Sequence, residues 1–305
     1  MHAQLLYDGA RKWFALASVL VGPLLVVIDA PFGRFTPSSQ NSIFLVDGIK
    51  SWIVMELVSP ICFLNAFFRA PLSTRAAEIS LGSPKSILAG AFLVHYLNRA
   101  LLSPLRTPSR SKSHIIVPFC AVIFNLFNGS LMGTFLSSPA APTQSAFARP
   151  TFWLGLALWA AGFAGNIIHD EILLNIRRNA KTKGKARDSG KPGEHYAIPH
   201  GLLYRFISYP NYFCEWVEWI GFALAADPRL FTALTSGHLS LPTWASLRPS
   251  APPAAFLPLL SPPWIFLVSE ILLMLPRAYR GHRWYQRKFG DNYPQERKIV
   301  IPFVL

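Results

Sequence analysis

Seven long apolar runs dominate this chain of 305 residues. A helix needs about 20 mostly apolar residues to cross the hydrocarbon core of a bilayer. The runs near that length are Trp13–Ala30, Ile43–Phe68, Ser86–Leu102, His114–Leu136, Thr151–Ile176, Leu202–Ala226 and Ala254–Pro276. The pattern predicts an all-α polytopic membrane protein, a seven-transmembrane-helix bundle followed by a short C-terminal segment on the cytosolic face.

Composition supports a lipid environment. Hydrophobic residues make up 51% of the chain and charged residues only 14%, against roughly 25% charged residues in soluble domains. A soluble fold of this size would expose large apolar patches. No internal repeat or second domain is visible, so we expect one membrane-embedded domain over residues 1–305, with loops at Ser137–Pro150, Asn179–Gly193 and Ser236–Pro253.

The net charge of +14 does not indicate nucleic-acid binding, because the basic residues lie between the apolar runs, where lipid headgroups explain them. Many more Lys and Arg residues follow the odd-numbered runs than the even-numbered ones, above all in Arg177–Lys191 and in the tail after Pro276. The positive-inside rule then predicts a lumenal N-terminus and a cytosolic C-terminus.

Common cofactor and metal motifs are absent from the sequence. The three cysteines, Cys62, Cys120 and Cys214, lie inside apolar runs and form no CxxC pair, so we expect small buried side chains and no metal site. There is no GxGxxG or P-loop motif, which excludes a nucleotide site of the Rossmann type. Gly129 and Gly133 form an isolated GxxxG, which indicates close approach of two helices.

Polar residues deep in the apolar runs are the candidates for function, because a charge at a helix centre costs about 2.5–3.5 kcal/mol on insertion scales. Glu56 lies in the middle of the second run, with no Lys or Arg within one turn. It is either a structural hydrogen-bonding group or an acid facing a substrate cavity. In the third run, Arg99 lies three and four residues after Tyr96 and His95, which places the three side chains on one face.

The fifth and sixth runs each carry a further polar set. Asn166 and Asp170 share a helix face that Arg177 continues; they could hold a polar ligand or form a stripe at the headgroup level. The sixth run contains Asn211, Glu215 and Glu218. Two acids in one apolar helix require cationic partners or donors from a ligand.

These segments carry a specific resemblance. The string PN-x-x-x-E-x-x-EWIG-x-A-L-A at Pro210–Ala225 and the ending YP-x-x-R-K-x-x-IPF at Tyr293–Phe303 resemble the steroid 5-alpha-reductases, also called 3-oxo-5-alpha-steroid 4-dehydrogenases. Similar motifs of that family occur at Gly165–Arg178, His95–Arg99 and Trp52–Pro60. The resemblance extends from about Trp52 to the end and is most specific over about residues 151–305.

The resemblance implies a seven-helix enzyme, NADP-dependent and typical of the endoplasmic reticulum membrane. NADPH would enter from the cytosolic side and reduce the C4–C5 double bond of a 3-oxo-4-ene steroid, with hydride delivered to C5. Glu56 and Tyr96 would polarise the C3 carbonyl, for which Glu56 must carry a proton, and Trp52 would pack on the steroid. The positions that match cofactor-binding residues are Arg99, Arg110, Asn166, Asp170, Arg177, Tyr196, Asn211, Glu215, Arg277 and Tyr285.

The sequence departs from the family pattern in three places. Ala197 stands where a basic residue is usual, Gly281 stands where the family has His in the tail motif, and Asn179–Ser189 is an insertion. Alternatives to the steroid reaction are reduction of an enoyl-CoA or a polyprenol, an isoprenylcysteine-type methyltransferase with S-adenosylmethionine, and a non-catalytic membrane scaffold. Glu56 weighs against the first alternative, and the intramembrane acids weigh against the scaffold.

Overall fold

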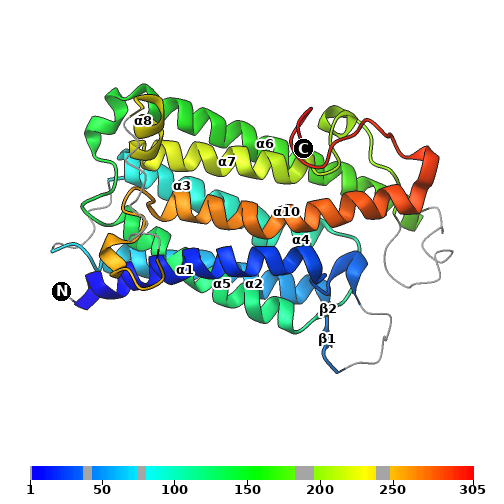
Figure 1. Ribbon diagram of the computed structural model, residues 1–305, viewed down its shortest axis with the longest axis horizontal. Helices are drawn as coiled ribbons and strands as arrows, with labels where there is room; N and C mark the ends of the chain where they lie inside the picture. The colour runs from blue at the N-terminus through cyan, green and yellow to red at the C-terminus, as the bar shows by residue number, and fades with distance from the viewer. Residues whose placement is uncertain (1, 37–42, 75–79, 183–195, 238–247) are drawn as a thin grey trace.

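The computed structural model describes residues 2–36, 43–74, 80–182, 196–237 and 248–305. Long helices lie side by side along one axis (Figure 1); they are α1 (His2–Val27), α2 (Gly48–Arg69), α3 (Pro84–Tyr96), α5 (Ile116–Leu136), α6 (Pro150–Thr182), α7 (Pro210–Ala226) and α10 (Pro262–Phe289). The shorter elements are η1 (Gly33–Phe35), β1 (Leu45–Val46), η2 (Leu97–Leu102), α4 (Ser103–Arg106), β2 (Ser113–His114), η3 (Gln144–Ala148), η5 (Leu202–Arg205), α8 (Arg229–Thr235), η6 (Pro253–Ala255) and η7 (Gly290–Asn292).

Four helices in the described part of the chain are long and apolar enough to cross a membrane: α1, α2, α5 and the stretch Pro150–Ala180 of α6. The predicted helical membrane protein is therefore confirmed in its broad class. The other three expected spans fall short in different ways. α3 ends after 13 residues and continues into the π-helix η2, α7 has 17 residues, and α10 becomes strongly polar in its second half.

Several predicted boundaries were wrong. α2 begins at Gly48 rather than Ile43, because the Asp47 side chain caps it by accepting from the backbone N–H groups of Ile49 and Lys50. The residues before it form β1, which pairs antiparallel with β2. The sixth run becomes η5 and then a helix that starts only at Pro210, since Pro is favoured at the first helical turn.

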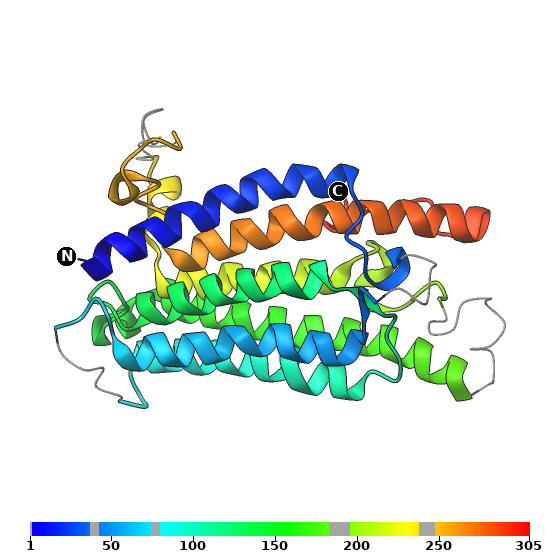
Figure 2. The same cartoon turned by 90° about the horizontal axis from the view of Figure 1, so that it is seen from below.

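The expected end of the last apolar run at Pro276 was also wrong, because α10 continues through it to Phe289. A proline inside a helix frees the carbonyl four residues earlier, here that of Leu272. Gly22 of α1 lies against this carbonyl so closely that an added Cβ would come within 3.0 Å of the oxygen. Close packing of α1 on α10, visible in Figures 1 and 2, therefore covers the freed group.

The expectation of close helix approach at Gly129 and Gly133 is confirmed. A Cβ added at Gly129 would lie 2.1 Å from the carbonyl oxygen of Ser59, and one added at Gly133 would lie 2.3 Å from that of Phe63. Both carbonyls belong to α2, so the two glycines bring the α5 backbone into contact with α2. This contact fixes the position of Glu56, which lies one turn from Ser59.

At the end of the bundle that holds the N-terminus (Figure 1), two buried cations fix a loop. Arg11 donates to the carbonyl oxygens of Phe256, Leu257 and Leu260 at 2.9–3.1 Å, and Lys12 donates to those of Pro249 and Ala251. The loop before α10 is thereby attached to α1.

We expect Arg11→Met to lower the thermal stability of the detergent-solubilised protein, because three carbonyls lose a charged donor. Hydrogen bonds to charged groups each contribute about 1.5–3 kcal/mol, so the loss of three of them predicts a destabilisation of at least about 4.5 kcal/mol. Arg283→Met, an exposed residue of α10, is the matched control. Equal unfolding temperatures for the two variants would show that these bonds do not hold the loop.

Candidate active site

A cavity of about 370 Å³ opens within the half of the bundle that carries β1, β2 and the C-terminal tail. Its volume lies within the usual range for small-molecule sites. Predicted site residues that line it are Trp52, Arg99, Arg110, Asn166, Asp170, Arg177, Asn211, Glu215, Arg277 and Tyr285. Residues from helices far apart in sequence thus meet around one space, as the predicted site requires.

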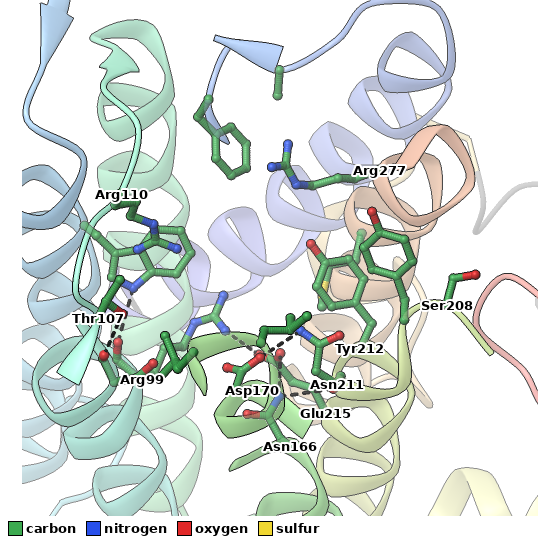
Figure 3. Close-up of a pocket in the computed structure, with 18 of the residues that line it drawn as sticks. Arg99, Thr107, Arg110, Asn166, Asp170, Ser208, Asn211, Tyr212, Glu215 and Arg277 are labelled. Carbon is green, nitrogen blue, oxygen red and sulfur yellow. Dashed lines mark hydrogen bonds and ion pairs between the residues drawn. The ribbon is translucent and has the colours of Figure 1, made fainter. Parts of the chain in front are cut away.

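A chain of polar contacts crosses the cavity wall (Figure 3). Arg99 Nη1 donates to Glu215 Oε1 at 2.7 Å, and Asn166 Nδ2 donates to Glu215 Oε2 at 3.2 Å. Asn211 Nδ2 donates to Asp170 Oδ1 at 3.0 Å, and Asn166 also reaches the Asn211 carbonyl at 3.1 Å. α6 and α7 are therefore joined at the site, and their side chains have fixed orientations.

Glu56 lies one step behind this wall. It is buried and does not line the cavity, but its Oε2 lies 3.2 Å from Arg99 Nε. A basic partner therefore does exist, contrary to what the second run alone suggested, because η2 brings Arg99 to α2. One guanidinium now faces two carboxyl groups, those of Glu56 and Glu215, which leaves one acidic group without a counter-charge of its own.

Tyr96 is also buried behind the wall, and α5 positions its hydroxyl. Asn128 Nδ2 donates to the Tyr96 hydroxyl at 2.8 Å, and the hydroxyl donates to Asn125 Oδ1 at 3.4 Å. Asn128 also donates to Ser59 Oγ at 3.2 Å and Asn125 to the Met55 carbonyl at 2.9 Å. These two asparagines were not among the predicted site residues, although they are polar residues deep in the apolar run His114–Leu136 and so meet the criterion applied to the others.

The two acids of α7 each contact a basic side chain, as the sequence predicted. Glu215 contacts Arg99, and Glu218 Oε1 lies 2.7 Å from His95 Nδ1. Glu218 Oε2 is buried and has no hydrogen-bond partner among the described residues. α3 and its extension η2 therefore meet α7 through two polar pairs.

Arginines surround the outer part of the cavity. The Arg110 guanidinium lies 3.7 Å from the ring centre of Trp52, and that of Arg277 lies 3.5 Å from the ring centre of Phe32. Arg177 also lines this region, while Arg280 pairs with Asp29 at 2.5 Å. Planar guanidinium groups bind phosphate through paired donors, so the outer cavity suits an anionic ligand.

Tyr196 does not line the cavity. Its ring lies 5.0 Å from that of Trp284 and 5.4 Å from Lys288 Nζ, on the polar half of α10. The insertion Asn179–Ser189 lies largely outside the described residues, apart from the end of α6. Tyr196 thus packs on Trp284, the residue that precedes the predicted site residue Tyr285 in α10.

Gly281, one of the departures from the family pattern, has a steric role. A Cβ at this position would lie 1.6 Å from the Tyr209 hydroxyl oxygen, and Tyr209 lines the cavity. A larger residue at Gly281 would displace Tyr209. The missing side chain at Gly281 therefore leaves room for Tyr209, which occupies that space and lines the cavity.

A buried hydrogen-bond network docks the C-terminal tail beside the cavity. Ser208 Oγ lies 2.6 Å from both His282 Nδ1 and the Tyr293 hydroxyl. Burial, together with the charge of Arg297, lowers the pKa of His282 below its ordinary value of 6.5. Burial and the nearby charge of Arg297 therefore favour the neutral imidazole in this network.

We expect acid to loosen the tail. Because the pKa of His282 is lower in the folded than in the unfolded protein, its contribution is complete above pH 6.5 and is lost as the pH falls through the folded value. The unfolding temperature should fall by a few degrees between pH 7.5 and about 5, and by less in His282→Gln, which cannot be protonated. An identical pH profile for this variant would contradict the assignment.

Comparisons with known proteins decide the family. The sequence profile described as 3-oxo-5-alpha-steroid 4-dehydrogenase matches residues 111–245 and 255–305. The chain belongs to this family. It is 32% identical to 3-oxo-5-alpha-steroid 4-dehydrogenase 1 of Rattus norvegicus over 91% of this chain and 87% of that protein, and 27% identical to steroid 5-alpha-reductase DET2 of Solanum lycopersicum over 90% and 88%. An uncharacterized protein of Schizosaccharomyces pombe is 36% identical over 98% of this chain and 99% of its own length.

The family predicted from the motifs is thus confirmed, and the chain is an oxidoreductase of the steroid 5-alpha-reductase family. This assignment favours a reductase that uses a nicotinamide cofactor over the methyltransferase and the scaffold. The arginines of the outer cavity fit the phosphates of such a cofactor.

Proposed function

We propose that this protein reduces the C4–C5 double bond of a 3-oxo-4-ene steroid with NADPH. The observation that carries the proposal is a single cavity with arginines around its outer part and the Arg99–Glu215 pair at its inner wall, directly in front of Glu56. One domain, residues 1–305, would contain the whole site. The phosphates would occupy the outer part, and the nicotinamide ring would point inward.

The protein's own residues would bind and polarise the substrate. Bound NADPH supplies the hydride that reaches C5. Arg110, Arg177 and Arg277 would hold its phosphates, while Asn166, Asp170 and Asn211 would offer donors and acceptors to its uncharged parts. Trp52 would pack on the steroid.

Tyr96 and Glu56 would donate hydrogen bonds to the C3 oxygen, which gains negative charge as hydride arrives. Such donors act most strongly when they are held in place before the reaction. Asn128 donates to the Tyr96 hydroxyl and holds it in place, which supports this role; the hydroxyl proton would turn from Asn125, which it reaches only at 3.4 Å, to the C3 oxygen. Arg99 contacts Glu215 at 2.7 Å and Glu56 at 3.2 Å, and the proposed role requires Glu56 to carry a proton when it donates.

The test is a product analysis of membranes that contain the protein. Each preparation receives a 4-ene-3-oxo steroid with NADPH or with S-adenosylmethionine, and parallel samples receive an enoyl-CoA or a polyprenol with NADPH. We expect only the steroid with NADPH to give a reduced product. Turnover of the enoyl-CoA or polyprenol alone would replace the substrate class, and a methylated product would overturn the proposal.

We further propose a seven-span topology in the endoplasmic reticulum, with a lumenal N-terminus and a cytosolic C-terminus. The N-terminus lies at one end of the bundle and the C-terminus lies in the other half (Figure 1), which supports an odd number of crossings. Glycosylation acceptors fused to each terminus should be modified only at the N-terminus. Modification at the C-terminus would contradict this topology, because it would place the C-terminus and the cofactor entrance on the lumenal side.

A further inference from the structure

His95 lines the cavity, but the proposed reaction gives it no role. It lies at the end of α3 directly before Tyr96, and the centres of the two rings are 5.1 Å apart. Its Nδ1 lies 2.7 Å from Glu218 Oε1. Its other ring nitrogen, Nε2, has no hydrogen-bond partner among the described residues and is not closed off from the cavity, as the unpaired Oε2 of Glu218 is. α7 thus holds one nitrogen of His95, and the other is free to contact a ligand.

Packing fixes the geometry of this pair of histidine and carboxyl side chains. Glu218 is fully buried on α7, and a Cβ added at Gly162 of α6 would lie 2.3 Å from its backbone nitrogen. The Trp219 ring centre lies 4.8 Å from that of His95, and the Phe163 ring centre lies 6.3 Å from it. The pair is therefore held rigidly in aromatic surroundings.

The same surroundings set the number of protons on the pair. In the described part of the chain, His95 is the one basic side chain that pairs with Glu218. Arg99 is already shared by two other acids, and Glu270 of α10 is a further buried acid nearby. An uncompensated charge in apolar surroundings is costly. The pair is neutral overall when it holds two protons, one between Nδ1 and Glu218 and one on Nε2, so the resting pair carries a proton on the nitrogen that opens to the cavity.

We propose that His95 donates the proton that C4 of the steroid receives, with Glu218 as the positioning residue that holds its imidazole. This inference rests on the proposed function, in which Tyr96 holds the C3 oxygen. C4 is bonded to C3, and the imidazole is the polar side chain directly beside Tyr96. The group that would polarise the carbonyl and the group that would protonate the neighbouring carbon thus follow each other in one helix.

The proton transfer balances within the pair. Once hydride has reached C5, the π electrons of the C4–C5 bond have moved toward C3, which gives an enolate of C3 and C4. C4 then forms a bond to the Nε2 proton, the electron pair of the N–H bond stays on Nε2, and the C3 carbonyl is restored. Nδ1 keeps its proton and donates it to the Glu218 carboxylate. A proton from solvent returns to the pair before the next turnover.

The test follows the configuration at C4 in D₂O, with the full-length protein in membranes, a 4-ene-3-oxo steroid and NADPH. The wild-type product should carry deuterium at C4 in a single configuration. In His95→Asn the amide nitrogen replaces Nδ1 and Nε2 is lost. A positioned acid contributes about a hundred- to ten-thousand-fold, so we expect turnover to fall at least about a hundredfold and deuterium to occupy both configurations. NADPH binding should stay within about twofold, and His200→Gln, at an exposed histidine, is the control.

Glu218→Gln is a second variant, in case His95→Asn does not fold. It keeps the shape, accepts from Nδ1 and leaves Nε2 without a proton, so it should mix the C4 configurations in the same way. The wild-type configuration at C4 in either variant, at any rate of turnover, would overturn the inference, and so would a mixture from the wild-type protein; both results leave the proposed function intact. No reduction of the steroid by the wild-type protein would instead reject the proposed function.

Discussion

Tyr96→Phe is expected to reduce steroid turnover about a hundred- to a thousand-fold, while NADPH binding stays within about twofold of wild type. Removal of one preorganised donor to a developing oxyanion typically costs about 2.7–4 kcal/mol. The Tyr96 hydroxyl is bound to α5 and does not line the cavity wall where the nucleotide would lie. The measurement is steroid reduction at saturating NADPH, with nucleotide binding measured separately.

Glu56 provides the companion test. Glu56→Gln keeps a donor and the shape, so it should retain more activity than Glu56→Ala. Tyr279→Phe is the matched control for Tyr96→Phe, because Tyr279 is 39% exposed on the polar half of α10. We expect this variant to behave as wild type. Near wild-type reduction by Glu56→Ala would remove this residue from the mechanism and would favour the enoyl-CoA or polyprenol alternative.

The second large effect concerns the choice of nucleotide. We expect the wild-type protein to bind NADPH at least about tenfold more tightly than NADH, because the 2'-phosphate adds charge for guanidinium groups to hold. Arg110→Met and Arg277→Met should each weaken NADPH binding by about 1.5–3 kcal/mol, or roughly ten- to a hundred-fold. Both side chains lie at the outer cavity and stack on aromatic rings.

Arg283→Met is the control for these two variants, since Arg283 is exposed on the same helix as Arg277 and does not line the cavity. Its affinity for NADPH should be unchanged. Equal affinity of the wild-type protein for NADH and NADPH would show that no arginine contacts the 2'-phosphate. A loss of NADH binding as large as that of NADPH would assign the arginine to the shared diphosphate.

Hydrophobic patterning predicted the helical membrane class and the long helices of the described chain, because length and apolarity are local properties of the sequence. Helix ends were less predictable, since they depend on contacts. α10 runs through Pro276, and Gly22 of α1 lies against the carbonyl that this proline frees, a contact that the sequence pattern does not reveal. α2 starts late because the segment before it pairs with β2.

Many site residues were predictable because a polar side chain is unusual inside an apolar run. Polar side chains deep in apolar runs, together with the family motifs, identified ten residues that line the cavity. Partners between helices were not predictable, because a search within one helical turn cannot find that Arg99 reaches Glu56. Glu270 was overlooked, although it is an acid in an apolar run like the others.

Label transfer tests the central claim most directly. The wild-type protein in membranes is given a 4-ene-3-oxo steroid and NADPH that carries deuterium at C4 of the nicotinamide, on either face in separate samples. We predict that one of the two samples gives a 5α-reduced steroid with a single deuterium at C5 and that Tyr96→Phe makes the same product far more slowly. A reduced steroid without deuterium at C5 from both samples, or no reduction at all, would contradict the claim that this cavity transfers hydride from NADPH to C5.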